Sequence, residues 1–403
     1  MTRAALLFAC AALMAAPTIA QAQPGQQLGG NPLANFASSV MDVFQHKPER
    51  PSLEPIAPGE GLAGGVGLAP DPWRTESLIK ELKARASGST HKYWAVDGSF
   101  AWQHLNDWRI EPYARVRSMK RLNFFGLGND SLEDNQSDYS LLERTVGAYG
   151  WKRPVPWFAV GARGDVMWPR TASGQHPDYK SVEQLFPPAS LPGLNEQSNF
   201  IHVQGFVNFN YPAGRNERPR RGGDYRIALG HYQDTSDTQH SFQRLELEGQ
   251  ERFTVFGRDR QLTLHALLSG AFVSADQTVP FYLMDTLGGA DNLRGFREDI
   301  IGSDDTTATL RSFDSFRFRD ASSVLFQVEF RQRLWAPLFL SVFFDAGSVA
   351  PRIGDLPLSD LHRGFGVGVS IFRANILAIR ADFSIAGGEG HPHYFLPGKA
   401  FGF

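Results

Sequence analysis

The sequence predicts an all-β fold, namely a transmembrane antiparallel β-barrel with one loop folded inward. Three observations predict it: an N-terminal export segment, a single cysteine, and stretches in which apolar and polar residues alternate with a period of two. The chain has 403 residues, of which 42% are hydrophobic and 20% charged, enough apolar material for a large core or a closed sheet. The formal net charge is -2 and no long basic run occurs, so we expect no nucleic-acid partner.

Residues 1–22 have the pattern of a cleaved secretory signal peptide. Arg3 precedes an apolar run from Ala4 to Ile19, and the small-residue site Ala20-Gln21-Ala22 follows it. The only cysteine, Cys10, lies inside that run, so the exported chain would have no disulfide, no thiolate metal site and no thiol nucleophile. After residue 22 no uncharged apolar run reaches the roughly 18 residues of a membrane-spanning helix, whereas alternating strands can still cross a membrane.

Residues 23–59 are rich in proline, glycine and glutamine, and we interpret them as a periplasmic tail. The proline spacing from Pro48 to Pro58 predicts no regular structure there. Asn31 and Pro32 can begin a short helix, because apolar residues follow at helical spacing as far as Phe44. Such a helix would plug a lumen or lie on the inner leaflet; a weakly ordered tail is the other interpretation.

We interpret residues 60–403 as the barrel. In the stretch 157–168, Val160 and Val166 lie on one face of a strand, while Arg163 and Asp165 lie on the other. A soluble β-sandwich would also alternate, around a dry core. Tryptophans near the predicted strand ends and the terminal Phe403 favour the membrane barrel, because aromatic girdles and a closing aromatic residue are typical of such barrels.

About fifteen strands can be counted, and they start near residues 60, 74, 92, 107, 137, 155, 197, 222, 241, 260, 321, 339, 363, 376 and 393. Single-chain bacterial barrels normally have an even number of strands, so one strand is missing near the N-terminus or two are merged. The longest predicted loops, at 120–136, 169–196, 274–320 and 347–362, all fall on one side, as expected for the outward-facing side of a barrel.

The most informative stretch runs from Leu287 to Phe296, in which glycines bend the backbone and Arg294 offers a cation. Alternation points Glu329 and Asp345 into the lumen from two neighbouring strands. Arg294 would reach these carboxylates only if its loop folds inward, where a guanidinium fork can bind a carboxylate with two hydrogen bonds. Spacing alone favours a solvated arginine on a surface loop.

These motifs together resemble the bacterial surface antigen family of outer-membrane barrels, which includes the barrel-assembly insertase and the two-partner secretion transporters. The resemblance rests on Leu293-Arg294-Gly295-Phe296, Val328-Glu329-Phe330-Arg331, Phe343-Phe344-Asp345-Ala346-Gly347 and the stretch from Phe124 to Asp130. It implies sixteen strands. It also implies a lock between loop and lumen and a C-terminal assembly signal. The lock would consist of Arg294, Gly295, Phe296, Asp345 and Glu329, and it would follow a turn at Gly288 and Gly289. The assembly signal would consist of Phe395, Phe401 and Phe403. Pro397 and Lys399 depart from the pattern of this signal.

The resemblance implies a protein of the cell outer membrane that inserts or translocates protein or lipid. Its partners would be outer-membrane lipid, the barrel-assembly machinery during its own biogenesis, and a client outer-membrane protein or lipid. The 37 residues from 23 to 59 are too few for a client-binding module, so we expect a barrel-only member of the family.

Two alternatives to this function remain open, a passive pore and an outer-membrane hydrolase. We expect no enzyme activity, no cofactor and no metal, because no Ser, His and Asn set occupies matching lumen positions. The candidate histidines are then isolated lumen or loop residues: His202, His265, His391 and His393.

Overall fold

The structure is a computed structural model of the 403-residue chain. It describes residues 49–52, 56–57, 63–70, 72–75, 77–104, 107–211, 221–236, 239–257, 259–289, 311–335, 338–373, 376–386 and 393–397. The expected signal peptide and the expected helix between residues 31 and 44 lie outside the described residues.

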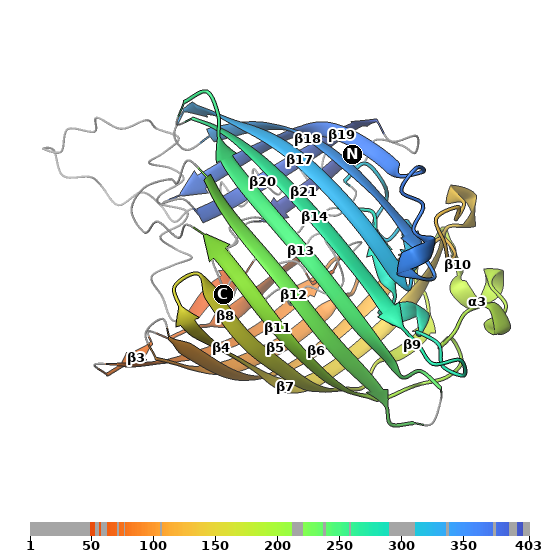
Figure 1. Cartoon of the computed structure of the whole chain (residues 1–403). Helices are drawn as coiled ribbons and strands as arrows, with labels where there is room; N and C mark the ends of the chain where they lie inside the picture. The colour runs from red at the N-terminus through yellow and green to blue at the C-terminus, as the bar shows by residue number, and fades with distance from the viewer. Residues whose placement is uncertain are drawn as a thin grey trace, which may run out of the picture.

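Sixteen of the nineteen strands in the main sheet of the described residues form an antiparallel meander, in which each strand pairs with the next along the chain. The sheet curls around a central space into a barrel (Figure 1). The meander consists of β1 (Glu49–Ser52), β2 (Ala63–Leu68), β4 (Leu78–Ser89), β5 (Trp94–His104), β6 (Trp108–Phe124), β7 (Ser137–Val155), β8 (Phe158–Met167), β11 (Phe200–Tyr211), β12 (Arg221–Asp234), β13 (Phe242–Thr254), β14 (Arg260–Phe272), β17 (Ser322–Trp335), β18 (Leu338–Ala350), β19 (His362–Arg373), β20 (Ile376–Ala386) and β21 (His393–Pro397).

Three shorter strands extend the meander at its edges. β3 (Trp73–Arg74) pairs with β4, while β9 (Arg170–Ser173) and β10 (Lys180–Ser181) pair with β7. A separate two-stranded sheet, β15 (Asp285–Leu287) with β16 (Phe318–Asp320), lies in the connection between β14 and β17. The short helices of the described residues are η1 (Glu133–Asn135), α3 (Val182–Leu185), η2 (Pro188–Ser190), η3 (Phe281–Leu283) and η4 (Ile353–Asp355).

None of these helices, in the part of the chain that the structure describes, is long and apolar enough to span a membrane.

The predicted all-β barrel fold is confirmed, and the two faces predicted for the stretch 157–168 are those that the structure shows. In β8, Val160 and Val166 are exposed on the outside, whereas Ala159, Asp165 and Met167 are buried on the inside. The outer faces of β14 and β17 carry similarly exposed apolar residues, including Leu264 and Val328. The barrel therefore presents an apolar outside and a polar inside, the arrangement that a lipid environment requires.

The strand positions agree with the count from the sequence, apart from one strand. That strand is β1, which pairs with β2 although it lies inside the stretch from Pro48 to Pro58 that was predicted to lack regular structure. The prediction failed because an edge strand tolerates proline, which only removes one donor from the ladder. The expected even number of strands follows from adding β1.

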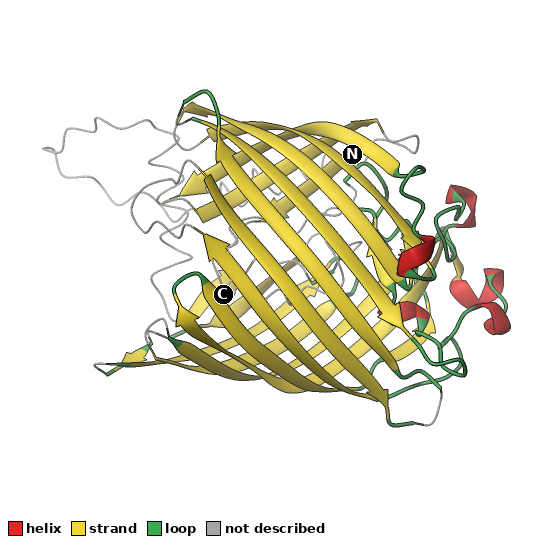
Figure 2. Ribbon diagram, viewed as in Figure 1, coloured by secondary structure: helices red, strands yellow, loops and turns green. Residues whose placement is uncertain are grey.

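The two ends of the barrel differ. The long connections, such as 125–136, 168–199 and 351–361, lie at one end together with all the helices of the described residues (Figure 2). At the other end the strands are joined by shorter connections, for example at 156–157 and 255–259. The largest cluster of buried apolar side chains, which contains Phe124, Tyr139 and Phe281, gathers at the long-loop end. The largest apolar cluster of the described residues therefore lies at one mouth of the barrel.

Candidate functional site

The connection between β14 and β17 folds into the barrel, and two glycines shape its entry. Gly288 and Gly289 follow β15 directly and both have positive φ, 111° and 88°. A Cβ atom on Gly288 would lie 2.2 Å from the carbonyl oxygen of Asp314, and one on Gly289 would lie 2.6 Å from Oγ of Ser315. Both positions thus require glycine for conformation and for space. They let the two arms of the loop pass close together before β16 returns the chain to the wall.

Arg311 is the loop residue that reaches the barrel wall. Its Nε donates to Oδ2 of Asp345 at 2.8 Å, and its Nη2 donates to Oδ1 at 2.7 Å, so the guanidinium fork engages both carboxylate oxygens. Its backbone N–H also donates to Oδ2. The guanidinium lies over the ring of Phe343, 3.6 Å from the ring centroid. Both partners are buried, with side-chain exposures of 3% for Arg311 and 0% for Asp345.

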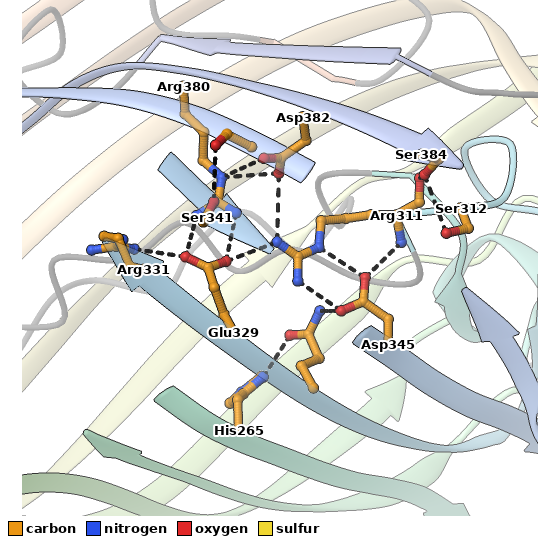
Figure 3. A network of polar contacts seen from close by, with 12 residues as sticks. His265, Arg311, Ser312, Glu329, Arg331, Ser341, Asp345, Arg380, Asp382 and Ser384 are labelled. Carbon is orange, nitrogen blue, oxygen red and sulfur yellow. Dashed lines mark hydrogen bonds and ion pairs between the residues drawn. The ribbon is translucent and has the colours of Figure 1, made fainter. Parts of the chain in front are cut away.

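Glu329 is the hub of the same network, because three guanidinium groups converge on its carboxylate (Figure 3). Arg311 donates to Oε2 at 3.0 Å, Arg331 to Oε1 at 3.0 Å, and Arg380 to both oxygens at 2.5 and 3.1 Å. Arg380 also donates from Nε to both oxygens of Asp382 at 2.9 Å. Among the described residues, three arginines thus face three carboxylates, counting Asp345, so the charges of these six side chains balance.

Strand register explains why these side chains meet. Asp345 of β18 stands opposite Gln327 of β17, so both point inward on neighbouring strands. The next strand, β19, places glycines at its inward positions. A Cβ atom on Gly368 would lie 2.3 Å from Oδ1 of Asp382, and one on Gly366 would lie 2.5 Å from Cζ of Phe343. Because these glycines have no side chain, β19 leaves space in the lumen for the charged network.

A second row of hydrogen bonds supports Asp345 from the wall. Gln327 donates from Nε2 to Oδ1 of Asp345 at 3.0 Å. The amide oxygen of Gln327 contacts Nδ1 of His265 at 2.8 Å, and Nε2 of His265 contacts Oε1 of Glu248 at 2.8 Å. This row crosses β13, β14, β17 and β18, and it orients the Gln327 amide so that its N–H faces Asp345. His265, one of the candidate histidines, is therefore part of the wall that supports the network.

The structure brings together only some of the residues predicted from the sequence. Glu329 and Asp345 meet in the lumen, but Arg294, Gly295 and Phe296 lie outside the described residues. The contacts expected for Arg294 on these two carboxylates are made by Arg311, which the sequence reasoning did not single out. Arg311 stands in no glycine-rich motif, so its only sequence signal was its place in the same loop. Of the expected assembly signal, Phe395 lies in β21, while Phe401 and Phe403 lie outside the described residues.

The surroundings of His202 do not support the hydrolase alternative. Nδ1 of His202 contacts Oδ2 of Asp165 at 2.9 Å, and Tyr113 and Arg163 also donate to that carboxylate. Nε2 of His202, where a nucleophile would have to stand, is buried with no hydrogen-bond partner among the described residues. His391 lies outside the described residues. His393 is the first residue of β21, where the structure describes the backbone but not the side chain. Within the described part of the chain no cluster of His, Cys, Asp and Glu could hold a metal ion.

A second contact holds the same connection at the mouth of the barrel. We call residues 125–136, which join β6 and β7, the mouth hairpin. The N–H of Gly128 donates to the carbonyl of Arg319 in β16 at 2.8 Å. The Arg319 side chain is 1% exposed and donates to the hydroxyl of Tyr139 and the carbonyl of Phe281, both at 2.9 Å. Its guanidinium is surrounded by aromatic rings within 6 Å, those of Phe124, Tyr139, Phe281 and Phe316.

The mouth hairpin also reaches the far wall. The N–H of Val349 in β18 donates to Oδ1 of Asn129, and Nε2 of His362 in β19 contacts the Asn129 carbonyl at 2.9 Å. β6 is the fifth strand of the sixteen-stranded meander and β18 is the thirteenth, so the hairpin crosses the mouth from one wall to the opposite one. Arg311 and Arg319 therefore hold this connection at two levels, near the middle of the lumen and at the mouth.

Comparisons with known proteins agree with this architecture. A family model described as the Omp85 superfamily domain matches residues 188–395. The structure is similar to BamA from Haemophilus ducreyi lacking POTRA domains 1–3, with a TM-score of 0.57, 13% identity, and coverage of 94% of this chain and 80% of that one. It is also similar to CdiB from Escherichia coli, with a TM-score of 0.51, 10% identity, and coverage of 88% and 61%. A search of curated proteins gives no match.

Proposed function

The chain belongs to the Omp85 superfamily, and from this premise we propose that it inserts or translocates protein or lipid through a lumen gated by the connection between β14 and β17. The superfamily places the chain among insertases and transporters of the outer membrane. We propose in addition that the inward loop acts as a gate. We further propose residues 1–22 as the signal peptide and 60–403 as the barrel; of the proposed periplasmic tail, 23–59, the strand β1 belongs to the barrel sheet.

The charged network around Arg311 is the observation that carries this proposal. A loop that merely covered a pore would need no buried ion pairs, since burying charges costs several kcal/mol per ion before their attraction offsets it. Here Arg311 is almost fully buried and bonds Asp345 and Glu329 together. Its removal would leave three carboxylates with two arginines, so the loop position and the charge balance of the lumen are coupled. A gate with two positions requires a coupling of this kind.

The test compares the wild-type protein with the variant Arg311→Ala/Arg319→Ala, which removes the guanidinium contacts of the loop at both levels and leaves its main-chain contacts in place. In planar bilayers the wild type should conduct weakly, and the variant should conduct more. In liposomes the wild type should accelerate the folding of a second barrel protein or move lipid or unfolded polypeptide across the bilayer. Arg352→Ala is the matched control, because Arg352 is an exposed arginine at the same end of the barrel.

Two results would contradict the proposal. A large and steady wild-type conductance, equal in the variant, would identify a passive pore. Wild-type liposomes that neither accelerate folding nor move lipid or polypeptide, with the protein correctly inserted, would exclude insertion and translocation.

A further inference from the structure

The three carboxylates that face Arg311 do not depend on Arg311 for their orientation. Asp345 accepts from Nε2 of Gln327, which is itself held by His265. Asp382 accepts from Nε of Arg380 with both of its oxygens. Each carboxylate therefore has a donor on the barrel wall that would stay in place if the loop left.

Glu329 is held in the same way. Arg331 donates to its Oε1, and Arg380 donates to both of its oxygens. All of these donors belong to β17 and β20, which are strands of the barrel and not parts of the loop. The site that receives Arg311 is thus preorganised, and preorganised sites bind their ligands without the cost of ordering side chains.

The shape of the site selects a planar cation. The ring of Phe343 forms its floor, is 3% exposed, and lies 3.6 Å from the central carbon of the Arg311 guanidinium. Gly366 of β19 leaves room for that ring. Carboxylate oxygens stand at the edge of the guanidinium plane, where its N–H groups point, and this fork cannot be matched by the three diverging donors of an ammonium group.

The charge of the site also requires a cation. Without Arg311 the described residues of the wall place the carboxylates of Glu329, Asp345 and Asp382 against the guanidinium groups of Arg331 and Arg380, which leaves one net negative charge in this set. All of these side chains are at most 10% exposed. An uncompensated charge in so dry a place is strongly unfavourable, so the empty site would attract a cation or take up a proton.

We propose that Asp345, Glu329, Asp382 and Phe343 form a guanidinium-binding site for which Arg311 is the resident ligand, and that an arginine side chain of a polypeptide in the lumen takes this site when the loop leaves. The second part rests on the proposed function, because it needs a polypeptide in the lumen. The first part concerns only the chemistry of the wall. An arriving arginine would keep the loop from returning, so occupancy by the passing chain would hold the gate open.

Methylguanidinium tests the first part on purified protein in detergent. The probe should raise the unfolding temperature of Arg311→Ala in a saturable way, with a dissociation constant on the order of 1 mM, as expected for so small a ligand. It should not stabilise the wild type, whose site is filled. Methylammonium at the same concentration should have little effect. Equal stabilisation by both cations, equal stabilisation of the wild type, or no stabilisation of the variant would overturn the inference.

One further variant and a refolding assay keep this test decisive. Arg311→Ala/Asp345→Asn lacks a carboxylate of the site and should lose the response to methylguanidinium; a retained response would mean that the probe binds elsewhere. If Arg311→Ala fails to fold, refolding is carried out with either probe. A higher yield with methylguanidinium than with methylammonium supports the site, and equal yields contradict it.

The second part is tested on wild-type protein in liposomes with two short peptides that differ only in one residue, arginine or lysine. The arginine peptide should make the connection between β14 and β17 sensitive to added protease, and the lysine peptide should not. Equal sensitivity with both peptides, or none with either, would overturn the role of the passing chain. Because the probe experiment in detergent involves no transport, a failure of the proposed function would leave that result standing.

Discussion

Glu329 is the residue on which the network depends most, since it is the carboxylate shared by Arg311, Arg331 and Arg380. Glu329→Gln keeps the size of the side chain but leaves three buried arginines with two carboxylates. Breaking a buried pair from one side typically costs about 3 to 5 kcal/mol, and we expect a loss of this size in the free energy of unfolding. The heat-dependent shift in gel mobility of the barrel measures it. Glu133→Gln, at an exposed position of η1, should change nothing.

Two arginines of one connection are candidates for pairing with Asp345, namely Arg311 and Arg294. A double-mutant cycle decides between them, because only residues in contact show a large interaction energy. We expect Arg311→Ala and Asp345→Ala to be strongly non-additive, by about 1 to 3 kcal/mol, since either single change already breaks the pair. Arg294→Ala combined with Asp345→Ala should be additive. The reverse pattern would assign the lock to Arg294.

Asp320 gives the connection a pH dependence. It is buried in β16 and accepts a hydrogen bond from the N–H of Ala321, and burial raises the pKa of its carboxyl group to about 6 from an ordinary value of 3.8. The folded protein thus takes up this proton more readily than the unfolded chain does. The resulting stability is present at acidic pH and is lost as the pH rises through about 6.

Asp320→Asn removes this dependence. At pH 8 the variant should be more stable than the wild type by about 1 to 2 kcal/mol after allowance for solvent screening, and at pH 4 the two should be equal. Unfolding temperatures in detergent at the two pH values provide the measurement. A wild type that is as stable as the variant at pH 8 would mean that Asp320 ionises freely.

At the scale of elements, alternation identified every strand of the meander except β1, because period-two patterning is a strong signal in strands of ten residues or more, as most of these are. β1 was missed since it has four residues and contains Pro51. The acidic half of the site was also predictable, because Glu329 and Asp345 point inward by the same alternation. Arg311 was not, because a loop has no period that tells which of its arginines will face the wall.

The glycines of β19 were overlooked although they shape the site. Gly368→Ala should disturb the network, because the new Cβ would lie 2.3 Å from Oδ1 of Asp382 and 2.6 Å from Oγ of Ser341. Overpacking of this kind costs about 1 to 3 kcal/mol, and here it would also displace a carboxylate. Gly354→Ala in η4 is the matched control, since its Cβ would meet nothing within 4 Å. Comparison of the two unfolding temperatures tests the prediction, and equal values would contradict it.

At the scale of the whole molecule, the two attachments of the inward connection act in series. Arg311 holds it to the wall near the middle of β17 and β18, and Arg319 holds it to the aromatic cluster and the mouth hairpin. A path through the lumen has to pass both levels. Release of either attachment alone therefore leaves one closure in place, and the effects on passage should not simply add.

Single-channel recording of four proteins tests this arrangement: the wild type, Arg311→Ala, Arg319→Ala and the double variant. Each single variant should show only brief, infrequent openings, because the remaining attachment keeps its own level closed. The double variant should open for long periods, with a total open time well above the sum of the two single variants. If Arg319→Ala alone opens the lumen fully, the mouth is the only gate and the Arg311 network serves stability; if Arg311→Ala alone does so, the mouth hairpin closes nothing.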